Sequence, residues 1–241
     1  MNPFLKIFLA AILFIPGSAL AQNQGKSNDT ISFKPINHAT FVITTKKLTI
    51  FVDPVGEAKQ YEKFSSPDMI LITDVHRDHL APDLVNSLKT QKTVVIGPKA
   101  VVDRLKHGEV LQNGESKSFN NVKVEAVPMY NLTEGRLKFH EKGRGNGYVV
   151  TLKDKRIYIS GDTEDIKEMR ALKNIDYAFV CMNLPYTMTV EQAASAVLEF
   201  QPKTVFPYHY RGTSGMSDVE KFKSLVSKNK KINVKLLDWY E

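Results

Sequence analysis

Residues 74–79 read DVHRDH and directly follow the apolar run MILIT at residues 69–73. The apolar run lies between Pro67 and the polar motif, which predicts a fully buried strand. No regular helix or strand presents both imidazoles and both carboxylates on one face, whereas a loop beyond the carboxyl end of the strand can bring them together. The stretch therefore predicts half of a metal site, and an ordinary polar loop is the alternative.

Two further predicted strands end in residues that can bind metal. Residues 157–163 read IYISGDT and deliver Asp162, and residues 204–209 read TVFPYH and deliver His209. Each has an alternative, because Asp162 can cap a following helix and a lone histidine is more often structural. Chance accounts poorly for three strand ends that each deliver His or Asp. Together they predict a site on one rim of the sheets.

The rest of the chain alternates between strand and helix patterns. Strands are also predicted at residues 31–37, 41–45, 48–53, 93–96, 116–119, 122–127, 147–152, 156–160, 177–182 and 204–206. Helices are predicted at residues 82–88, 99–105, 164–172, 190–200 and 218–227. Two meanders, each leading into strand and helix alternation, predict an α/β (α+β) fold. We expect a four-layer αββα sandwich of two mixed β-sheets with helices outside.

The N-terminus has the pattern of an export signal. Residues 1–21 combine Lys6, a short apolar run and an Ala-Leu-Ala sequence, which predicts a secretory signal peptide cleaved after Ala21. An uncleaved N-terminal anchor is the alternative. Residues 22–30 form a polar segment, and residues 31–241 are enough for one domain with a sizeable core. We expect a periplasmic or secreted mature chain with no membrane span.

Amino-acid composition narrows the range of reactions and binding partners that we expect for this protein. The formal charge of +7 comes from scattered lysines, with one dense cluster at residues 228–231, so we expect a small-molecule substrate and no nucleic acid. The single cysteine, Cys181, lies in an apolar run, which excludes a disulfide framework and favours a core residue over a nucleophile. No Gly-x-Ser-x-Gly motif is present. The sequence carries no signal for the oligomeric state.

With these stretches assembled, the chain resembles the metallo-β-lactamase-fold hydrolase superfamily. The similarity is strongest to the branch of small single-domain proteins that includes the ascorbate-6-phosphate lactonase-like hydrolases. It covers most of residues 31–241 and rests on the order of six motifs: NHA at 37–39, FVDP at 51–54, DVHRDH at 74–79, NGY at 146–148, GDT at 161–163 and YH at 208–209. The resemblance implies a metal-dependent hydrolase that uses metal-activated water on a small ester, lactone, amide or phosphoester.

The resemblance also implies one or two divalent metal ions. It assigns His76 to the first metal position, Asp78, His79 and His209 to the second, and Asp162 to both as a bridge. Asp78 would orient the attacking hydroxide. Asp53 would lie behind the ligand loop and steady it.

Two positions depart from the family pattern. Asp74 stands where the family usually has His, and Asn131 stands where a mid-chain strand usually delivers another His. A carboxylate binds zinc much as imidazole does, so we expect Asp74 to ligate, whereas Asn131 is a poor ligand that we expect in a supporting position. His140 either replaces the missing imidazole or is a surface histidine. The added oxygen ligands favour harder ions, so Zn²⁺ is our first choice, with Mn²⁺ or Fe²⁺ as alternatives.

Substrate contacts are predicted at the ends of three loops. His38, Tyr186 and Arg211 are the candidates, Arg211 for an anionic group. A structural hydrogen bond is the alternative for His38, and packing or capping is the alternative for Tyr186 and Arg211. The leading hypothesis is an exported hydrolase. A β-lactamase or a nuclease fits less well. The departures at Asp74 and Asn131 keep open a non-catalytic member that binds metal or ligand.

Overall fold

The computed structural model describes residues 30–119 and 121–240. The predicted signal peptide at 1–21 lies outside these residues, as does the polar segment at 22–30 apart from Thr30. Within the described part of the chain, every helix is too short or too polar to cross a membrane.

The first sheet contains six strands in the order of the sequence. They are β1 (Ser32–Asn37), β2 (Thr40–Thr44), β3 (Thr49–Val52), β4 (Met69–Leu71), β5 (Val94–Gly97) and β6 (Glu109–Val110). β1 to β3 form the predicted antiparallel meander, and β3 to β6 are parallel. The parallel half places the carboxyl end of β4, and with it the loop at residues 74–79, on one rim of the sheet.

The second sheet contains seven strands. In spatial order they are β15 (Asn233–Val234), β12 (Thr204–Tyr208), β11 (Tyr177–Cys181), β10 (Lys155–Ile159), β9 (Gly145–Leu152), β8 (Val122–Met129) and β7 (Ser116–Phe119). β7 to β10 are antiparallel, and β10, β11, β12 and β15 are parallel. Both sheets are therefore mixed, as predicted. A small hairpin of β13 (Arg211–Gly212) and β14 (Gly215–Met216) follows β12.

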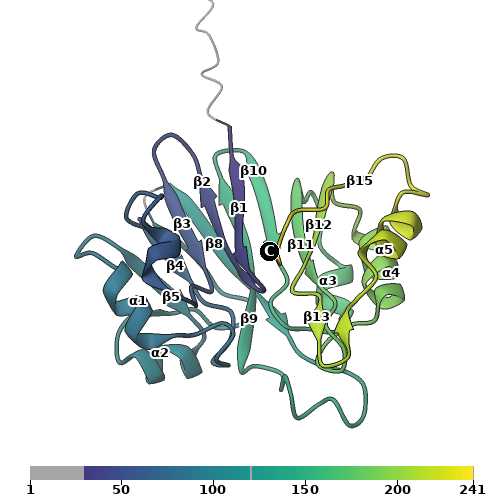
Figure 1. The fold of residues 1–241 in the computed structure, drawn as a ribbon, viewed down its shortest axis with the longest axis horizontal. Coiled ribbons are helices and arrows are strands. Elements are labelled where there is room, and N and C mark those ends of the chain that lie inside the picture. Colours follow the sequence, from purple (N-terminus) through teal and green to yellow (C-terminus); the bar gives the residue numbers. More distant parts are fainter. Residues whose placement is uncertain (1–29, 120, 241) are drawn as a thin grey trace, which may run out of the picture.

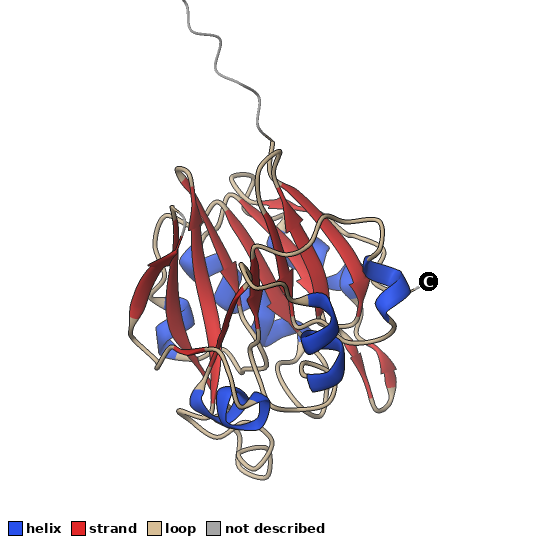
Figure 2. Ribbon diagram, turned by 90° about the vertical axis from the view of Figure 1, so that its left-hand side faces the viewer, coloured by secondary structure: helices blue, strands red, loops and turns tan. Residues whose placement is uncertain are grey.

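Helices lie on the outer faces of the two sheets (Figure 1). α1 (Pro82–Leu88) and α2 (Lys99–Leu105) lie beside the first sheet, and α3 (Lys167–Arg170), α4 (Val190–Phe200) and α5 (Val219–Val226) lie beside the second. A short 3-10 helix spans Ala58–Tyr61. Figure 2, viewed from the left-hand side of Figure 1, shows strands running across the molecule with helices around them. The prediction of a four-layer αββα sandwich is confirmed.

The packing of β3 shows why two hydrophobic cores form. Ile50 and Val52 belong to the large core between the sheets, whereas Phe51 belongs to a smaller core that includes residues of α1 and α2. Alternate side chains of a strand point to opposite faces, so a continuous apolar strand is buried on both sides. Cys181 lies fully inside the large core, and burial raises the pKa of its thiol to about 11, which agrees with a core residue.

Most predicted elements match, and the differences are confined to one helix and to very short strands. α1, α2, α4 and β7 have the predicted bounds, and Thr189 and Gln192 form a capping box at the start of α4. The helix predicted at 164–172 is reduced to α3, because Glu164 is used to hold a neighbouring loop. Asp162 therefore caps no helix, since Ile166 is the residue before α3. The two-residue strands β6, β13, β14 and β15 are too short to leave a sequence pattern.

Candidate metal centre

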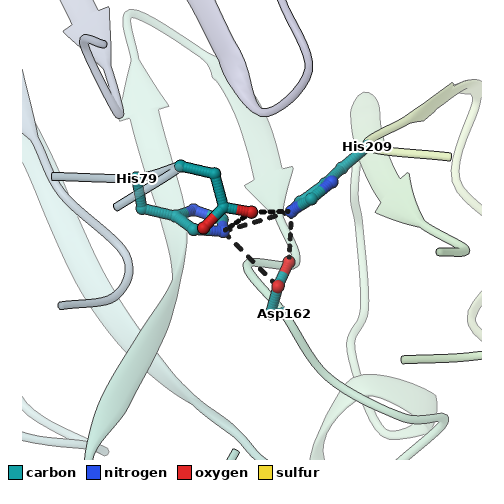
Figure 3. Close-up of side chains that lie close together, drawn as sticks. His79, Asp162 and His209 are labelled. Carbon is teal, nitrogen blue, oxygen red and sulfur yellow. Dashed lines mark hydrogen bonds and ion pairs between the residues drawn. The ribbon is translucent and has the colours of Figure 1, made fainter. Parts of the chain in front are cut away.

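Three loops at one rim of the sheets carry most of the predicted ligands. The loop at 74–79 follows β4, Asp162 follows β10, and His209 follows β12. The side chains of His79, Asp162 and His209 point toward one another (Figure 3). Two sets of residues have ligand atoms that all lie within 4.8 Å of each other: the His79 group, made of Asp78, His79, Asp162 and His209, and the Asp74 group, made of Asp74, His76 and His140.

The atoms of the His79 group converge on one point. Asp162 lies between two imidazoles, with Oδ2 at 3.4 Å from His79 Nε2 and Oδ1 at 3.1 Å from His209 Nε2. The two Nε2 atoms are 3.2 Å apart. Asp78 Oδ2 lies 3.5 Å from His209 Nε2 and 3.9 Å from His79 Nε2. Two imidazole nitrogens and two carboxylates form a donor set that suits Zn²⁺, Mn²⁺ or Fe²⁺.

A buried carboxylate holds His79 from behind. Asp53 Oδ2 lies 2.8 Å from His79 Nδ1, and Asp53 in turn accepts hydrogen bonds from the backbone N–H and the hydroxyl of Thr73. Because Asp53 is an acceptor, His79 donates from Nδ1 and turns Nε2 toward the centre. A carboxylate in this position fixes the tautomer of a metal-binding histidine and raises its basicity. This is the supporting position that the resemblance implied for Asp53.

The Asp74 group shares Asp162 with the His79 group. His76 Nδ1 lies 2.9 Å from Asp74 Oδ2, and His140 Nε2 lies 3.8 Å from the same oxygen. His140 Nε2 is also 3.2 Å from Asp162 Oδ2, so the Asp162 carboxylate touches both groups. His140 is buried, which rules out the surface alternative, and its Nδ1 donates to the Tyr186 carbonyl at 3.2 Å.

Arg144, which the sequence did not single out, contacts the unusual ligand position. Its Nη2 donates to Asp74 Oδ2 at 3.0 Å and also to the Phe139 carbonyl. Asp74 Oδ1 accepts from the Val75 N–H at 2.7 Å. Burial alone would raise the pKa of Asp74, but the His76 hydrogen bond and nearby positive charges lower it. A cation therefore accompanies the carboxylate that stands where the family usually has a neutral imidazole.

Asn131 supports His140 and does not belong to either ligand group. Its Nδ2 donates to the carbonyls of Arg136 at 3.0 Å and Tyr186 at 2.7 Å, and its backbone N–H donates to the His140 carbonyl. Glu164, which follows β10 and which the sequence did not single out, supports this loop from outside. Its buried carboxylate accepts from the N–H groups of Leu132 and Thr133 and pairs with Arg136 at 3.0 Å. These contacts hold the loop that brings His140 to the centre.

The charges of the centre favour an ionised bridging carboxylate. Burial alone would raise the pKa of Asp162, but the charges on His209 and His79 outweigh it, and the pKa lies well below its ordinary value of 3.8. Burial opposes a charge on His79, yet the carboxylates of Asp162 and Asp53 raise its pKa well above 6.5. A metal ion bound here would displace that proton, so binding is coupled to pH.

A cavity of about 350 Å³ opens beside the two groups. Its walls are made by His76, Asp78, Phe139, His140, Asp162, Asn183 and Tyr186. Phe139 and Tyr186 pack edge to face, with ring centroids 5.1 Å apart. Among the described residues, none of those lining the cavity is Lys or Arg. A hollow of about 380 Å³ near Glu191 and Lys221 contains none of the predicted ligands.

The three predicted substrate contacts have different surroundings. Tyr186 lines the cavity. His38 Nε2 lies 3.5 Å from Asp78 Oδ2, while its Nδ1 is 2.8 Å from the hydroxyl of Tyr240. Arg211 does not line the cavity, because its guanidinium stacks over the Tyr240 ring at 4.7 Å. The structure therefore gives no support to Arg211 as an anion contact inside this cavity.

Comparisons with known proteins give matches over most of the chain. A family model described as a beta-lactamase superfamily domain matches residues 32–209. Two relatives named metal-dependent hydrolases, from Pyrococcus abyssi and Pyrococcus horikoshii, are 30% and 31% identical over 219 and 211 residues. These matches cover 85% and 81% of this chain and 96% and 92% of the relatives. The crystal structure of a proposed metal-dependent hydrolase from Parabacteroides distasonis has 39% identity and a TM-score of 0.81, covering 87% of this chain and 94% of that one.

Proposed function

Because the chain belongs to the beta-lactamase superfamily domain family, we propose that it hydrolyses a small uncharged carbonyl compound with metal-activated water. The substrate classes are an ester, a lactone or an amide. The observation that carries the proposal is the Asp162 carboxylate, which lies within 3.4 Å of imidazoles from both ligand groups at the wall of a cavity. A divalent ion at such a site polarises a carbonyl and lowers the pKa of bound water from 15.7 to about 7.

The protein's own side chains divide the remaining work. Asp162 faces imidazoles of both groups, so its carboxylate is available to a metal ion in either group. Asp78 is the most exposed carboxylate of the His79 group, with 43% of its side chain accessible, and it lines the cavity. It can accept a hydrogen bond from the attacking water and orient it toward the substrate.

The cavity lining favours an uncharged substrate over a phosphoester. Phosphate groups are commonly bound by Arg or Lys through charge-assisted hydrogen bonds. The lining offers instead the aromatic rings of Phe139 and Tyr186 and the amide of Asn183. Aromatic walls suit an apolar group, and the amide suits a carbonyl or alcohol. A phosphoesterase is therefore the weaker candidate.

The donor set also bears on the metal. Each ligand group, counted with Asp162, offers two imidazoles and two carboxylates. We propose Zn²⁺ as the first choice, with Mn²⁺ or Fe²⁺ favoured more than in a histidine-rich site. Elemental analysis of protein purified without added metal tests this. A protein that carries no metal and binds none would support the non-catalytic alternative.

A substrate panel tests the activity. Purified protein is loaded separately with Zn²⁺, Mn²⁺ and Fe²⁺ and assayed with aryl esters, lactones, anilides, a β-lactam, a phosphomonoester, a phosphodiester and single-stranded RNA and DNA. We expect turnover of one or more carbonyl compounds that chelation removes and metal restores. Turnover restricted to the phosphate compounds would contradict the proposed substrate class. Metal-loaded protein that is inactive on every compound would contradict the hydrolase.

Export is a separate proposal. The signal peptide pattern at residues 1–21 supports a periplasmic or secreted protein. Cell fractionation of the full chain, with N-terminal sequencing of the mature product, should give a protein that begins at Gln22. A cytoplasmic product that retains Met1 would contradict it.

A further inference from the structure

The side-chain amide of Asn183 is held in one orientation at the cavity wall. Asn183 follows β11, lines the cavity and is only 2% exposed. Its Oδ1 accepts a hydrogen bond from the hydroxyl of Thr187 at 2.6 Å. Its backbone N–H donates to the same Thr187 oxygen at 2.9 Å. The five-residue segment from 183 to 187 therefore closes on itself and fixes the side chain.

A count of donors and acceptors decides which end of the amide faces the cavity. The hydroxyl of Thr187 is fully buried and has one proton, which needs an acceptor. Asn183 Oδ1 accepts it at 2.6 Å, and the other group within reach is the sulfur of Cys181, which is a weak acceptor. If the amide were reversed, Nδ2 and the backbone N–H would both donate to Thr187, and the hydroxyl proton would be left with that weak acceptor alone. The amide oxygen therefore faces Thr187.

The opposite end of the amide is available to a ligand. In residues 30–119 and 121–240, no protein acceptor forms a hydrogen bond with Asn183 Nδ2. This nitrogen is also not among the buried polar atoms that lack a partner, so it has access to solvent. Because Asn183 lines the cavity with Asp162 and His140, that access is through the cavity.

We propose that Asn183 Nδ2 is a catalytic hydrogen-bond donor to the carbonyl oxygen of the substrate. This role rests on the proposed function. As the oxygen of water forms a bond to the carbonyl carbon, the π electron pair moves onto the carbonyl oxygen, and the N–H donor stabilises that negative charge. The pair then returns, the bond to the leaving group breaks, and the leaving group departs with a proton that came from the water.

A fixed neutral donor suits this substrate class. The carbonyl oxygen is uncharged in the substrate and gains charge only in the transition state, so a preorganised donor stabilises the transition state more than the substrate. A phosphoester is already charged before reaction, and a single neutral amide would bind substrate and transition state more evenly. The orientation that Thr187 imposes on Asn183 thus favours carbonyl chemistry.

The test compares three variants on the best carbonyl substrate of the panel. We expect Asn183→Ala to lower kcat by about 10²- to 10³-fold with little change in KM, as for the loss of one oxyanion donor. Asn183→Asp, which replaces the donor with an acceptor of the same shape, should lower kcat at least as much. Thr187→Val frees the amide to rotate and should lower kcat by about 2- to 10-fold, the effect of one hydrogen bond.

Metal content and a control variant far from the site distinguish a loss of catalysis from a loss of folding. All three variants should retain the metal stoichiometry of the wild type, since Asn183 belongs to neither ligand group. Asn86→Ala, on an exposed position of α1, is the matched control and should keep the wild-type kcat. A kcat within twofold of wild type for Asn183→Ala would overturn the inference while leaving the hydrolase intact. If Asn183→Ala does not fold, an unchanged kcat in Asn183→Asp overturns it equally.

Discussion

The His79 group and the Asp74 group use the same kinds of ligand in different surroundings. Behind His79 lies a buried carboxylate, Asp53, which accepts from the imidazole at 2.8 Å. Behind Asp74 lies a cation, Arg144, which donates to the carboxylate at 3.0 Å. An acceptor behind a ligand raises its basicity, whereas a cation behind a ligand lowers its attraction for a metal ion. The residue next to each ligand therefore affects the affinity for a metal ion as much as the type of ligand does.

Burial is similar in the two groups, because each has one accessible side chain, Asp78 at 43% and His76 at 40%, among buried partners. The contrast therefore rests on the charges next to the buried ligands, which solvent screens little. From these charges we expect the His79 group to bind its metal more tightly and the Asp74 group to be the position that fills second.

The largest effect should come from removing the residue that both groups share. Asp162→Asn takes a carboxylate from each group, and we expect both metals to be lost and kcat to fall by more than about 100-fold, because loss of a supporting partner alone costs about 10- to 100-fold. Elemental analysis and kinetics measure both quantities. Asp165→Asn is the control, since Asp165 pairs with Arg170 outside both groups. Retention of two metals in Asp162→Asn would remove the basis for treating Asp162 as a bridge.

The second effect should fall on one group only. Asp53→Asn removes the negative charge behind His79, and we expect the His79 group to bind metal about 10- to 100-fold more weakly. Competition with a chromophoric chelator resolves the two binding steps. The weaker step, assigned to the Asp74 group, should not change. Equal weakening of both steps would show that Asp53 acts through the fold and not through His79.

The third change should reduce the difference between the two groups by strengthening the weaker one. Arg144→Gln removes the positive charge beside Asp74, and we expect the second metal to bind more tightly by on the order of tenfold. Arg144→Lys retains the charge and should bind metal as the wild type does. Chelator competition and calorimetry give the affinity of each step. Loss of the second metal in Arg144→Gln would mean that Arg144 is needed to orient Asp74 as a ligand.

The smallest effect should come from the loop that carries His140. Asn131→Ala removes two hydrogen bonds, to the carbonyls of Arg136 and Tyr186, and leaves the backbone contact to His140. We expect the second binding step to weaken by about 2- to 10-fold. The first step provides the internal control. A change confined to that first step would contradict the placement of Asn131 behind the Asp74 group.

The sequence predicted the fold well because the patterns of its elements are local. A continuous apolar strand, a capping box at Thr189 and a run of alternating residues each depend on neighbours a few positions apart. The helix predicted at 164–172 was too long for a reason that lies elsewhere in the chain. Glu164 accepts hydrogen bonds from Leu132 and Thr133, more than thirty positions earlier, and no local pattern reports such a contact.

The same distinction applies to the candidate site. The DVHRDH loop, Asp162 and His209 are visible in the sequence because each follows a strand, and strands that run parallel end at the same rim. The contact between Arg144 and Asp74 joins residues 70 positions apart, and it has no periodic or motif signal. Asn183 and Thr187 are likewise ordinary polar residues in the sequence. Only the hydrogen bond between their side chains in the structure orients the Asn183 amide.

The sequence by itself determined which strands form, where they end and which side chains those ends deliver, because backbone pattern and strand register act over short distances. Only the tertiary structure decided that His140 reaches Asp162, that Arg144 accompanies Asp74 and that Arg211 stacks on Tyr240 outside the cavity. Those outcomes depend on hydrogen bonds and charges that meet across loops. Such contacts form only after the two sheets have packed and brought their rims together.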